Sequence, residues 1–293
     1  MKKFYLLFAI CLFSLVSYAQ DSDEGGVKEN VLEEQVGNNP ITLNASLEIG
    51  SSNVANHFIA TQNFSGSVYG IHADLGRFYK RWKNVSWNLS FDYLNSVKNS
   101  GSLENSAQTS SLGYSAVGLN YSSYYNWLFG KSFMIKVGGG IDLMYDMTEA
   151  LKYRTNNPAS MNLSAQLEAS AGISYVFQFK KWMLGLSGNI SVPFLGVINT
   201  DSKHETGLPT DGLMKKYDSH FKGTTFSNLQ GVDYDLGVKF IMPRVALGVG
   251  VASDNRWWCV NDVQNYRKNI MFRVGLSFNL VSLKQTKTIH RYF

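Results

Sequence analysis

Apolar and polar residues alternate with a period of two along most of this chain. In the first such segment every second residue from Ile41 to Ile49 is apolar, and the residues between them are polar. Successive side chains of a β-strand point to opposite faces of the sheet, so this spacing predicts a strand with one apolar and one polar face. The pattern predicts about ten strands, with eight to twelve compatible with it, at 41–49, 69–75, 87–93, 112–124, 133–145, 161–177, 182–192, 232–240, 245–251 and 270–280.

The connections between the predicted strands alternate in length. The long, polar ones cover 51–66, 95–111, 148–159, 198–228 and 253–268. The short ones cover 79–84, 123–131, 180–181 and 242–244. Long loops at one end and tight turns at the other are typical of an antiparallel up-and-down barrel in a membrane. An even number of strands places both termini on the short-turn side, which we expect to be periplasmic.

The apolar face of these strands is predicted to point outward, toward lipid. The polar face is rich in Gly, Ser and Asn, which suits a narrow polar interior better than the outside of a soluble barrel. Aromatic residues such as Trp87, Trp127 and Tyr145 fall near strand ends, where interfacial girdles occur. The predicted fold class is therefore all-β, a transmembrane antiparallel up-and-down β-barrel in an outer membrane.

The N-terminus has the features of a secretory signal peptide. Two lysines precede an apolar run from Phe4 to Val16, and Ser17 and Ala19 supply small residues for cleavage before Gln20. The predicted organisation is a signal peptide at 1–19, a flexible periplasmic segment at 20–39, the barrel at 40–280 and a periplasmic tail at 281–293.

Charge and cysteine content narrow the function classes. Of 27 basic residues, two lie in the signal peptide, so the remaining 25 face 22 acidic residues. This small, scattered excess does not indicate nucleic-acid binding. Cys259 is the single cysteine after the signal peptide, so it has no partner for a disulfide within the chain. The expected partners are outer-membrane lipids, the barrel-assembly machinery and an unknown extracellular ligand, and we expect a monomer.

Two resemblances concern the C-terminal part of the chain. Arg273-Val274-Gly275-Leu276-Ser277-Phe278-Asn279-Leu280 resembles the assembly signal of outer-membrane proteins, although the chain continues to Phe293. The run Ile190–Val197, with Leu247–Gly250 and Val260–Val263, is similar to an uncharacterised family of Bacteroides-type bacteria, which implies no known activity.

The predicted polar face carries many charges. Eight acidic residues, three basic residues and one histidine point inward: Glu48, His72, Asp74, Asp92, Lys136, Asp142, Asp146, Glu168, Asp233, Asp235, Lys239 and Arg273. Charges in a crowded interior need partners, so the first interpretation is an ion-pair network that fills the barrel. The alternative is a cation-binding or cation-conducting interior. Ten strands leave little free bore, since open aqueous channels have 16–18 strands.

An enzyme remains an alternative. Asp218-Ser219-His220 and Asp233-Tyr234-Asp235 are similar to the Asp-x-His and Asp-x-Asp pairs of omptin-like outer-membrane proteases. The family places its Asp-x-Asp in the second long loop, where this chain has Glu104 as its acid. We therefore assign no catalytic residue and keep Asp218, His220, Asp233 and Asp235 as candidates for a rim hydrolase. No cysteine or histidine cluster has metal-ligand spacing, and no cofactor is predicted.

The expected long loops combine charged and aromatic residues. Arg256-Trp257-Trp258 and Tyr217–Phe221 are the clearest cases, and each could bind a partner or cover the mouth of the barrel. The sequence favours an outer-membrane barrel with a structural or ligand-binding role at the cell surface. A narrow channel for small solutes or cations and a rim hydrolase, acting on protein or lipid, are the alternatives.

Overall fold

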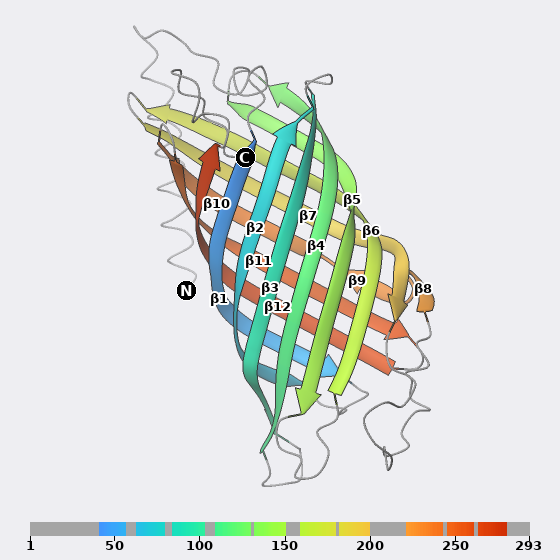
Figure 1. The fold of residues 1–293 in the computed structure, drawn as a ribbon. Coiled ribbons are helices and arrows are strands. Elements are labelled where there is room, and N and C mark those ends of the chain that lie inside the picture. Colours follow the sequence, from blue (N-terminus) through green and yellow to red (C-terminus); the bar gives the residue numbers. More distant parts are fainter. Residues whose placement is uncertain are drawn as a thin grey trace, which may run out of the picture.

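The protein is an antiparallel β-barrel in a computed structural model, seen from the side in Figure 1. The structure describes residues 41–56, 63–79, 84–102, 109–129, 132–150, 159–179, 182–199, 221–242, 245–260 and 263–279. The expected signal peptide, periplasmic segment and C-terminal tail lie outside these residues, as do Asp218 and His220. No helix within the described ranges is long and apolar enough to cross a membrane.

Twelve strands are present in the described residues. They are β1 (Thr42–Asn56), β2 (Phe64–Phe78), β3 (Val85–Ser102), β4 (Thr109–Phe129), β5 (Phe133–Ala150), β6 (Ala159–Phe179), β7 (Trp182–Asn199), β8 (Phe221–Thr225), β9 (Leu229–Gly231), β10 (Asp233–Ile241), β11 (Val245–Val260) and β12 (Val263–Asn279).

Ten of these strands close the barrel. Strands β1 to β7 pair in sequence order, β7 pairs with β10, and β10, β11 and β12 lead back to β1. The predicted ten-stranded antiparallel barrel is therefore confirmed. Strand β10 has only 9 residues. The short β8 pairs with β7 and the short β9 pairs with β11, so these two strands continue the wall beyond the end of β10.

The two ends of the barrel differ. We call the end where Thr42 pairs with Asn279 the terminal end. The opposite end, where Asn56 pairs with Asn265, is called the long-loop end. The terminal end also holds the short connections after β2, β4, β6 and β10.

The strands reach farther toward the long-loop end than the sequence predicts. Much of 51–66, 95–111 and 253–268 was expected to be loop, yet β1 continues to Asn56 and β11 to Val260. The expected turn at 123–131 is also mostly strand, since β4 ends at Phe129. The alternation that marks the lipid-facing segments does not continue there, because outward residues beyond the lipid are polar while apolar residues such as Val54 and Leu112 face the interior. The exposed residues Ser51 and Ser67, for example, still pair across β1 and β2.

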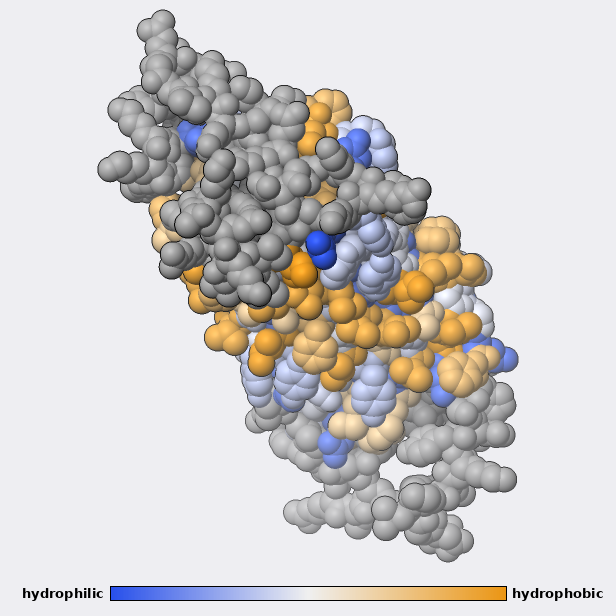
Figure 2. Space-filling view, turned by 45° about the horizontal axis from the view of Figure 1, so that its top comes forward, coloured by the Kyte–Doolittle hydropathy of each residue, from blue (hydrophilic) through white to orange (hydrophobic). Residues whose placement is uncertain are grey.

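The outer surface carries an apolar belt, as predicted. Leu47 and Ile49 are 68% and 63% exposed, and their outward neighbours on other strands are also large and apolar. Figure 2 shows this belt as a hydrophobic band across the visible face, with more hydrophilic residues below it. The buried polar residues of the inner face are mostly Ser and Asn, and Glu48, Asp142, Asp146 and Glu168 are among them. This inverted polarity is that of a barrel surrounded by lipid.

The interior also contains apolar clusters. At the terminal end Phe78 of β2 packs with residues of β5, β6, β7, β10 and β11, so this cluster crosses the bore. We call it the terminal plug; its members are Phe78, Met134, Val176, Met183, Ile241 and Ala246. Two further clusters, one around Leu112 and one around Trp258, line the interior toward the long-loop end.

Candidate functional site: the charged interior

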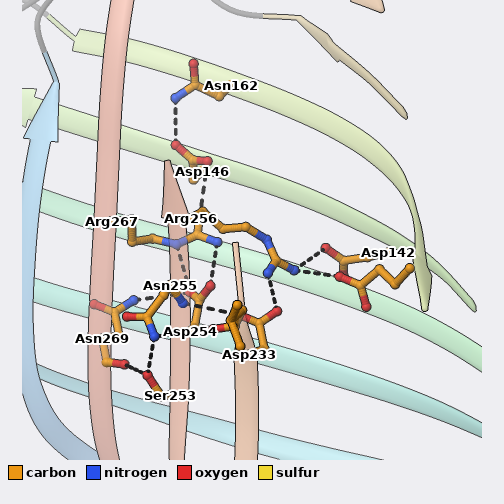
Figure 3. Close-up of polar contacts among 12 residues, drawn as sticks. Asp142, Asp146, Asn162, Asp233, Ser253, Asp254, Asn255, Arg256, Arg267 and Asn269 are labelled. Atoms are coloured by element: carbon orange, nitrogen blue, oxygen red, sulfur yellow. Dashed lines mark hydrogen bonds and ion pairs between the residues drawn. The ribbon is translucent and has the colours of Figure 1, made fainter. Parts of the chain in front are cut away.

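Two buried arginines dominate the interior toward the long-loop end. Arg267 of β12 is 1% exposed. Its Nε lies 2.8 Å from Asp254 Oδ2, and its Nη1 lies 3.5 Å from Asp146 Oδ2 on β5. Four strands separate β12 from β5 in either direction around the ring, so this contact spans the bore. Figure 3 shows Arg267 reaching toward Asp146 from the opposite strands.

The second arginine holds three carboxylates together. Arg256 Nη2 lies 2.6 Å from Glu168 Oε1 and 3.6 Å from Asp142 Oδ2, and Nη1 contacts Asp233. Arg256, Glu168 and Asp142 are all buried, so these two ion pairs are removed from solvent. A buried guanidinium needs such partners, because an uncompensated buried charge is strongly destabilising. Figure 3 shows how it joins β11 to β5 and β10.

Amide side chains hold these carboxylates in place. Asn162 lies directly opposite Asp146 in the β5–β6 register and donates from Nδ2 to Asp146 Oδ1 over 2.7 Å. Asn120 donates to Glu168 Oε2 over 3.1 Å, and Asn269 donates to Asp254 Oδ2 over 3.3 Å. We call the whole set the arginine layer; it comprises Arg256, Arg267, Asp142, Asp146, Glu168, Asp233 and Asp254.

Sequence reasoning missed three members of the arginine layer. Asp254, Arg256 and Arg267 fall in the segment 253–268, which was predicted to be an extracellular loop. That prediction was wrong: Arg256 lies in β11, and Trp258 beside it is buried. The sequence did contain a signal for their inward position. The even-numbered residues of β11 face inward, and Asp254 and Arg256 continue that alternation.

A second polar cluster lies nearer the terminal end. Arg273 of β12 pairs in register with Glu48 of β1, and its Nε donates to Glu48 Oε1 over 2.8 Å. Its Nη1 also contacts Asp235 of β10. Arg273 therefore links β12 to the adjacent β1 and, across β11, to β10 from inside the barrel.

His72 lies beside this pair, between two carboxylates. Its Nδ1 is 2.6 Å from Asp92 Oδ1, and its Nε2 is 3.3 Å from Asp74 Oδ2. Asn44 donates to the other oxygen of Asp74 over 2.7 Å. One ligand atom each from Glu48, His72 and Asp92 lies within 4.8 Å of the others. Three strands thus assemble a possible metal-ligand set that spacing along the chain did not reveal.

A cavity of about 340 Å³ lies between the terminal plug and the arginine layer. Its lining includes Phe78 and Met134 of the plug and Arg256 of the layer. Lys136 and Lys239 also line it, and Lys136 Nζ lies 5.0 Å from the ring centre of Tyr124. Nine acidic and five basic side chains face the interior within the described ranges, so its formal charge is negative. The cavity suits small polar or cationic species.

The candidates for a rim hydrolase are not assembled by the described residues. Asp233 contacts Arg256 and accepts a hydrogen bond from the Asn255 backbone over 3.1 Å. Asp235 contacts Arg273. Both carboxylates are therefore ion-paired inside the barrel, whereas a general base needs a free position beside its substrate.

Solved structures with similar architecture are outer-membrane barrels. The translocator domain of the autotransporter NalP from Neisseria meningitidis is 10% identical, with a TM-score of 0.38 and 94% and 97% of this chain and that chain covered. The outer membrane protease OmpT of Escherichia coli is 10% identical (TM-score 0.45, 83% and 97% covered). The Pseudomonas putida toluene transporter TodX is 8% identical (TM-score 0.33, 82% and 90% covered). With TM-scores below 0.5, these likenesses assign no activity to this chain.

Comparison at the level of sequence identifies the family. The comparison with curated proteins found no match. The family described as "Protein of unknown function (DUF3316)" matches residues 5–287, which is almost the whole chain. This barrel, which has an apolar outer face and buried ion pairs across its interior, belongs to the DUF3316 family.

Proposed function

We propose that this protein is a non-conducting outer-membrane barrel that serves as a rigid structural or ligand-binding scaffold at the cell surface. The observation that carries this proposal is the contact of Arg267 with Asp146 across the full width of the bore. A passage for solutes would have to break buried ion pairs at this level. It would also have to displace the terminal plug, where Phe78 is 4% exposed.

The part of the barrel beyond the apolar belt supports a role at the surface. Strands β4 and β6 have 21 residues, whereas about 9–11 residues suffice to cross a membrane. The excess extends toward the long-loop end, where outward residues such as Ser65 and Lys268 are exposed and polar. A rigid wall that projects from the lipid can position loops for binding.

A crevice in this projecting part offers a place for a polar ligand. It measures about 400 Å³ and combines two aromatic rings with several amides: Asn53, Ala55, Asn63, Trp257, Gln264, Asn265 and Tyr266. Trp257 and Tyr266 lie opposite each other in the β11–β12 register. Aromatic faces and amides supply apolar contact and directed hydrogen bonds, as binding pockets for small molecules do.

The proposal includes the placement of the chain. Export would use residues 1–19, and the host would be a Gram-negative bacterium of Bacteroides type. Both termini would be periplasmic, which agrees with long connections at the opposite end. The barrel-assembly machinery would recognise Arg273–Leu280, and the protein would act as a monomer among outer-membrane lipids.

Planar-bilayer recording tests whether the bore is closed. The wild-type protein is expected to give no conductance steps. The double variant Arg256→Ala/Arg267→Ala is expected to give small steps or flickering current, whereas Lys268→Ala, which changes an exposed outward residue, should remain silent. Discrete steps from the wild type would overturn the proposal.

A narrow cation channel is the second candidate, because acidic side chains outnumber basic ones in the interior. It predicts cation-selective steps from the wild type in the same recordings. The reversal potential in a salt gradient measures that selectivity directly.

A further inference from the structure

We propose that Glu48, His72 and Asp92 form a binding site for a divalent transition-metal ion such as Zn²⁺. The three side chains come from the adjacent strands β1, β2 and β3, and all three face the interior. The site is independent of whether the bore conducts, since it lies against one side of the wall.

The separation of the ligand atoms fits such an ion. One oxygen or nitrogen atom from each residue lies within 4.8 Å of the other two. Zn²⁺ binds His nitrogen and carboxylate oxygen at about 2.0–2.2 Å, which places ligand atoms about 3–4 Å apart. Small side-chain rotations would close the remaining gap, and the backbone can stay as it is because the strands are paired in register.

An unpartnered carboxylate oxygen points to a missing ligand. The Glu48 side chain is fully buried, and Arg273 approaches its Oε1 from both Nε and Nη2, at 2.8 and 2.6 Å. Among the residues that the structure describes, Glu48 Oε2 has no hydrogen-bond partner. Leaving a buried charged oxygen unpaired is costly, and a cation would remove this cost. Gly70 lies opposite Glu48 in the register, and a Cβ there would be 3.2 Å from Oε2.

The surroundings of His72 resemble the support of a metal-bound histidine. Its Nε2 faces Asp74 Oδ2 at 3.3 Å, and Asn44 holds Asp74 by a hydrogen bond of 2.7 Å. Metal-bound histidines usually donate their other ring N–H to a carboxylate, which fixes the ring and raises the basicity of the ligand nitrogen. Here Nδ1 is left to face Asp92 Oδ1 at 2.6 Å.

The charges balance when a divalent ion is bound. Glu48 and Asp92 together neutralise it, and His72 binds as the neutral ring. Arg273 does not compete for Oε2, since it approaches Oε1 and also contacts Asp235. Without metal, the same geometry holds a protonated His72 between Asp74 and Asp92.

Titration calorimetry with the metal-stripped, detergent-folded full-length protein tests the site. Zn²⁺ is expected to bind once per chain and Co²⁺ to give a visible absorption band from a nitrogen and oxygen ligand set. Glu48→Gln, His72→Gln and Asp92→Asn are each expected to weaken Zn²⁺ binding by about tenfold or more. Asp74→Asn, which changes only the support of His72, is expected to weaken it by roughly tenfold.

Asp142→Asn is the matched control. It also removes one negative charge from the interior but belongs to the arginine layer. Its Zn²⁺ affinity should stay at the wild-type value, and each variant should show the heat-modifiable gel mobility of a folded barrel. Should a variant fail to fold, the shift of the wild-type unfolding temperature by Zn²⁺ still reports binding.

Three results would overturn the site. They are a wild type that binds no Zn²⁺ by calorimetry or unfolding temperature, an Asp142→Asn variant that loses as much affinity as His72→Gln, and undiminished binding by His72→Gln. The last result would assign the metal to histidines elsewhere in the chain.

Discussion

Arg267 and Asp146 meet inside the barrel from opposite walls. Arg267 stands on β12 and Asp146 on β5, and their charged atoms lie 3.5 Å apart. Because no two strands of a ten-stranded ring are farther apart than these, the contact joins the two halves of the barrel as well as closing its bore.

Removal of the Arg267 guanidinium should destabilise the fold. Arg267→Met leaves the buried Asp146 and the half-buried Asp254 without their cation, and breaking a buried pair in this way costs about 3–5 kcal/mol. Urea unfolding in lipid vesicles measures this loss. Lys268→Met removes an exposed charge from the next residue and should change the free energy of unfolding by less than about 0.5 kcal/mol. Equal losses for both variants would contradict the buried role of Arg267.

Arg256 and Glu168 should be energetically coupled. Their atoms lie 2.6 Å apart, so in a double-mutant cycle with Arg256→Met and Glu168→Gln the loss should be less than additive, by about 1–3 kcal/mol. Arg256→Met alone should cost more than Glu168→Gln alone, because Arg256 also serves Asp142 and Asp233. Glu149→Gln changes a residue on the outward face of β5. Its loss of unfolding free energy and that of Arg256→Met should therefore be additive. Strict additivity in the first cycle would argue against the ion pair.

A charge in the apolar belt should be costly, and the same charge beyond it should not. Val249 is 43% exposed in the middle of the apolar run of β11, so Val249→Arg should destabilise the folded barrel by about 2–4 kcal/mol. Ser65→Arg, at an exposed position beyond the belt, should cost about 0–1 kcal/mol. Unfolding in vesicles measures both, and a reversed order would misplace the lipid boundary.

Gly138 should not tolerate a side chain. A Cβ at this position would overlap the Ser123 carbonyl and lie 2.8 Å from the Cα of Tyr124 on β4. Gly138→Ala should therefore destabilise the barrel by about 1–3 kcal/mol, as overpacking does. Gly223→Ala is the control, since a Cβ there meets nothing within 4 Å. Thermal unfolding followed by gel mobility compares them; if Gly138→Ala matches the wild type, the close approach of β4 and β5 is looser than described.

The alternation of apolar and polar residues predicts the architecture of this barrel without any tertiary information. Side chains that face lipid must be apolar, and successive residues of a strand face opposite sides. Apolar residues of the belt, such as Leu47 and Leu276, therefore recur at every second position of their strands. The same parity placed Glu48, His72 and Asp92 on the inner face. This alternation of apolar and polar residues stops where the strands leave the lipid. Beyond the belt, residues such as Ser51 and Asp254 carry no hydrophobic signal, so the pattern predicts loops where β1 and β11 continue as strands.

Which charges meet depends on the folded barrel. Once the strands are known, the alternation of faces predicts that Arg256 and Glu168 point inward. These residues are 88 positions apart in the sequence, however, and they come together only because the ring of strands closes. The pairing of Glu48 with Arg273, across 225 positions, depends on the register of β1 against β12. Backbone hydrogen bonds can form in many registers, so the register depends on turn geometry and on the packing of side chains from distant strands, which no local pattern of residue types encodes. The arginine layer and the Glu48–His72–Asp92 cluster therefore became visible only in the folded barrel.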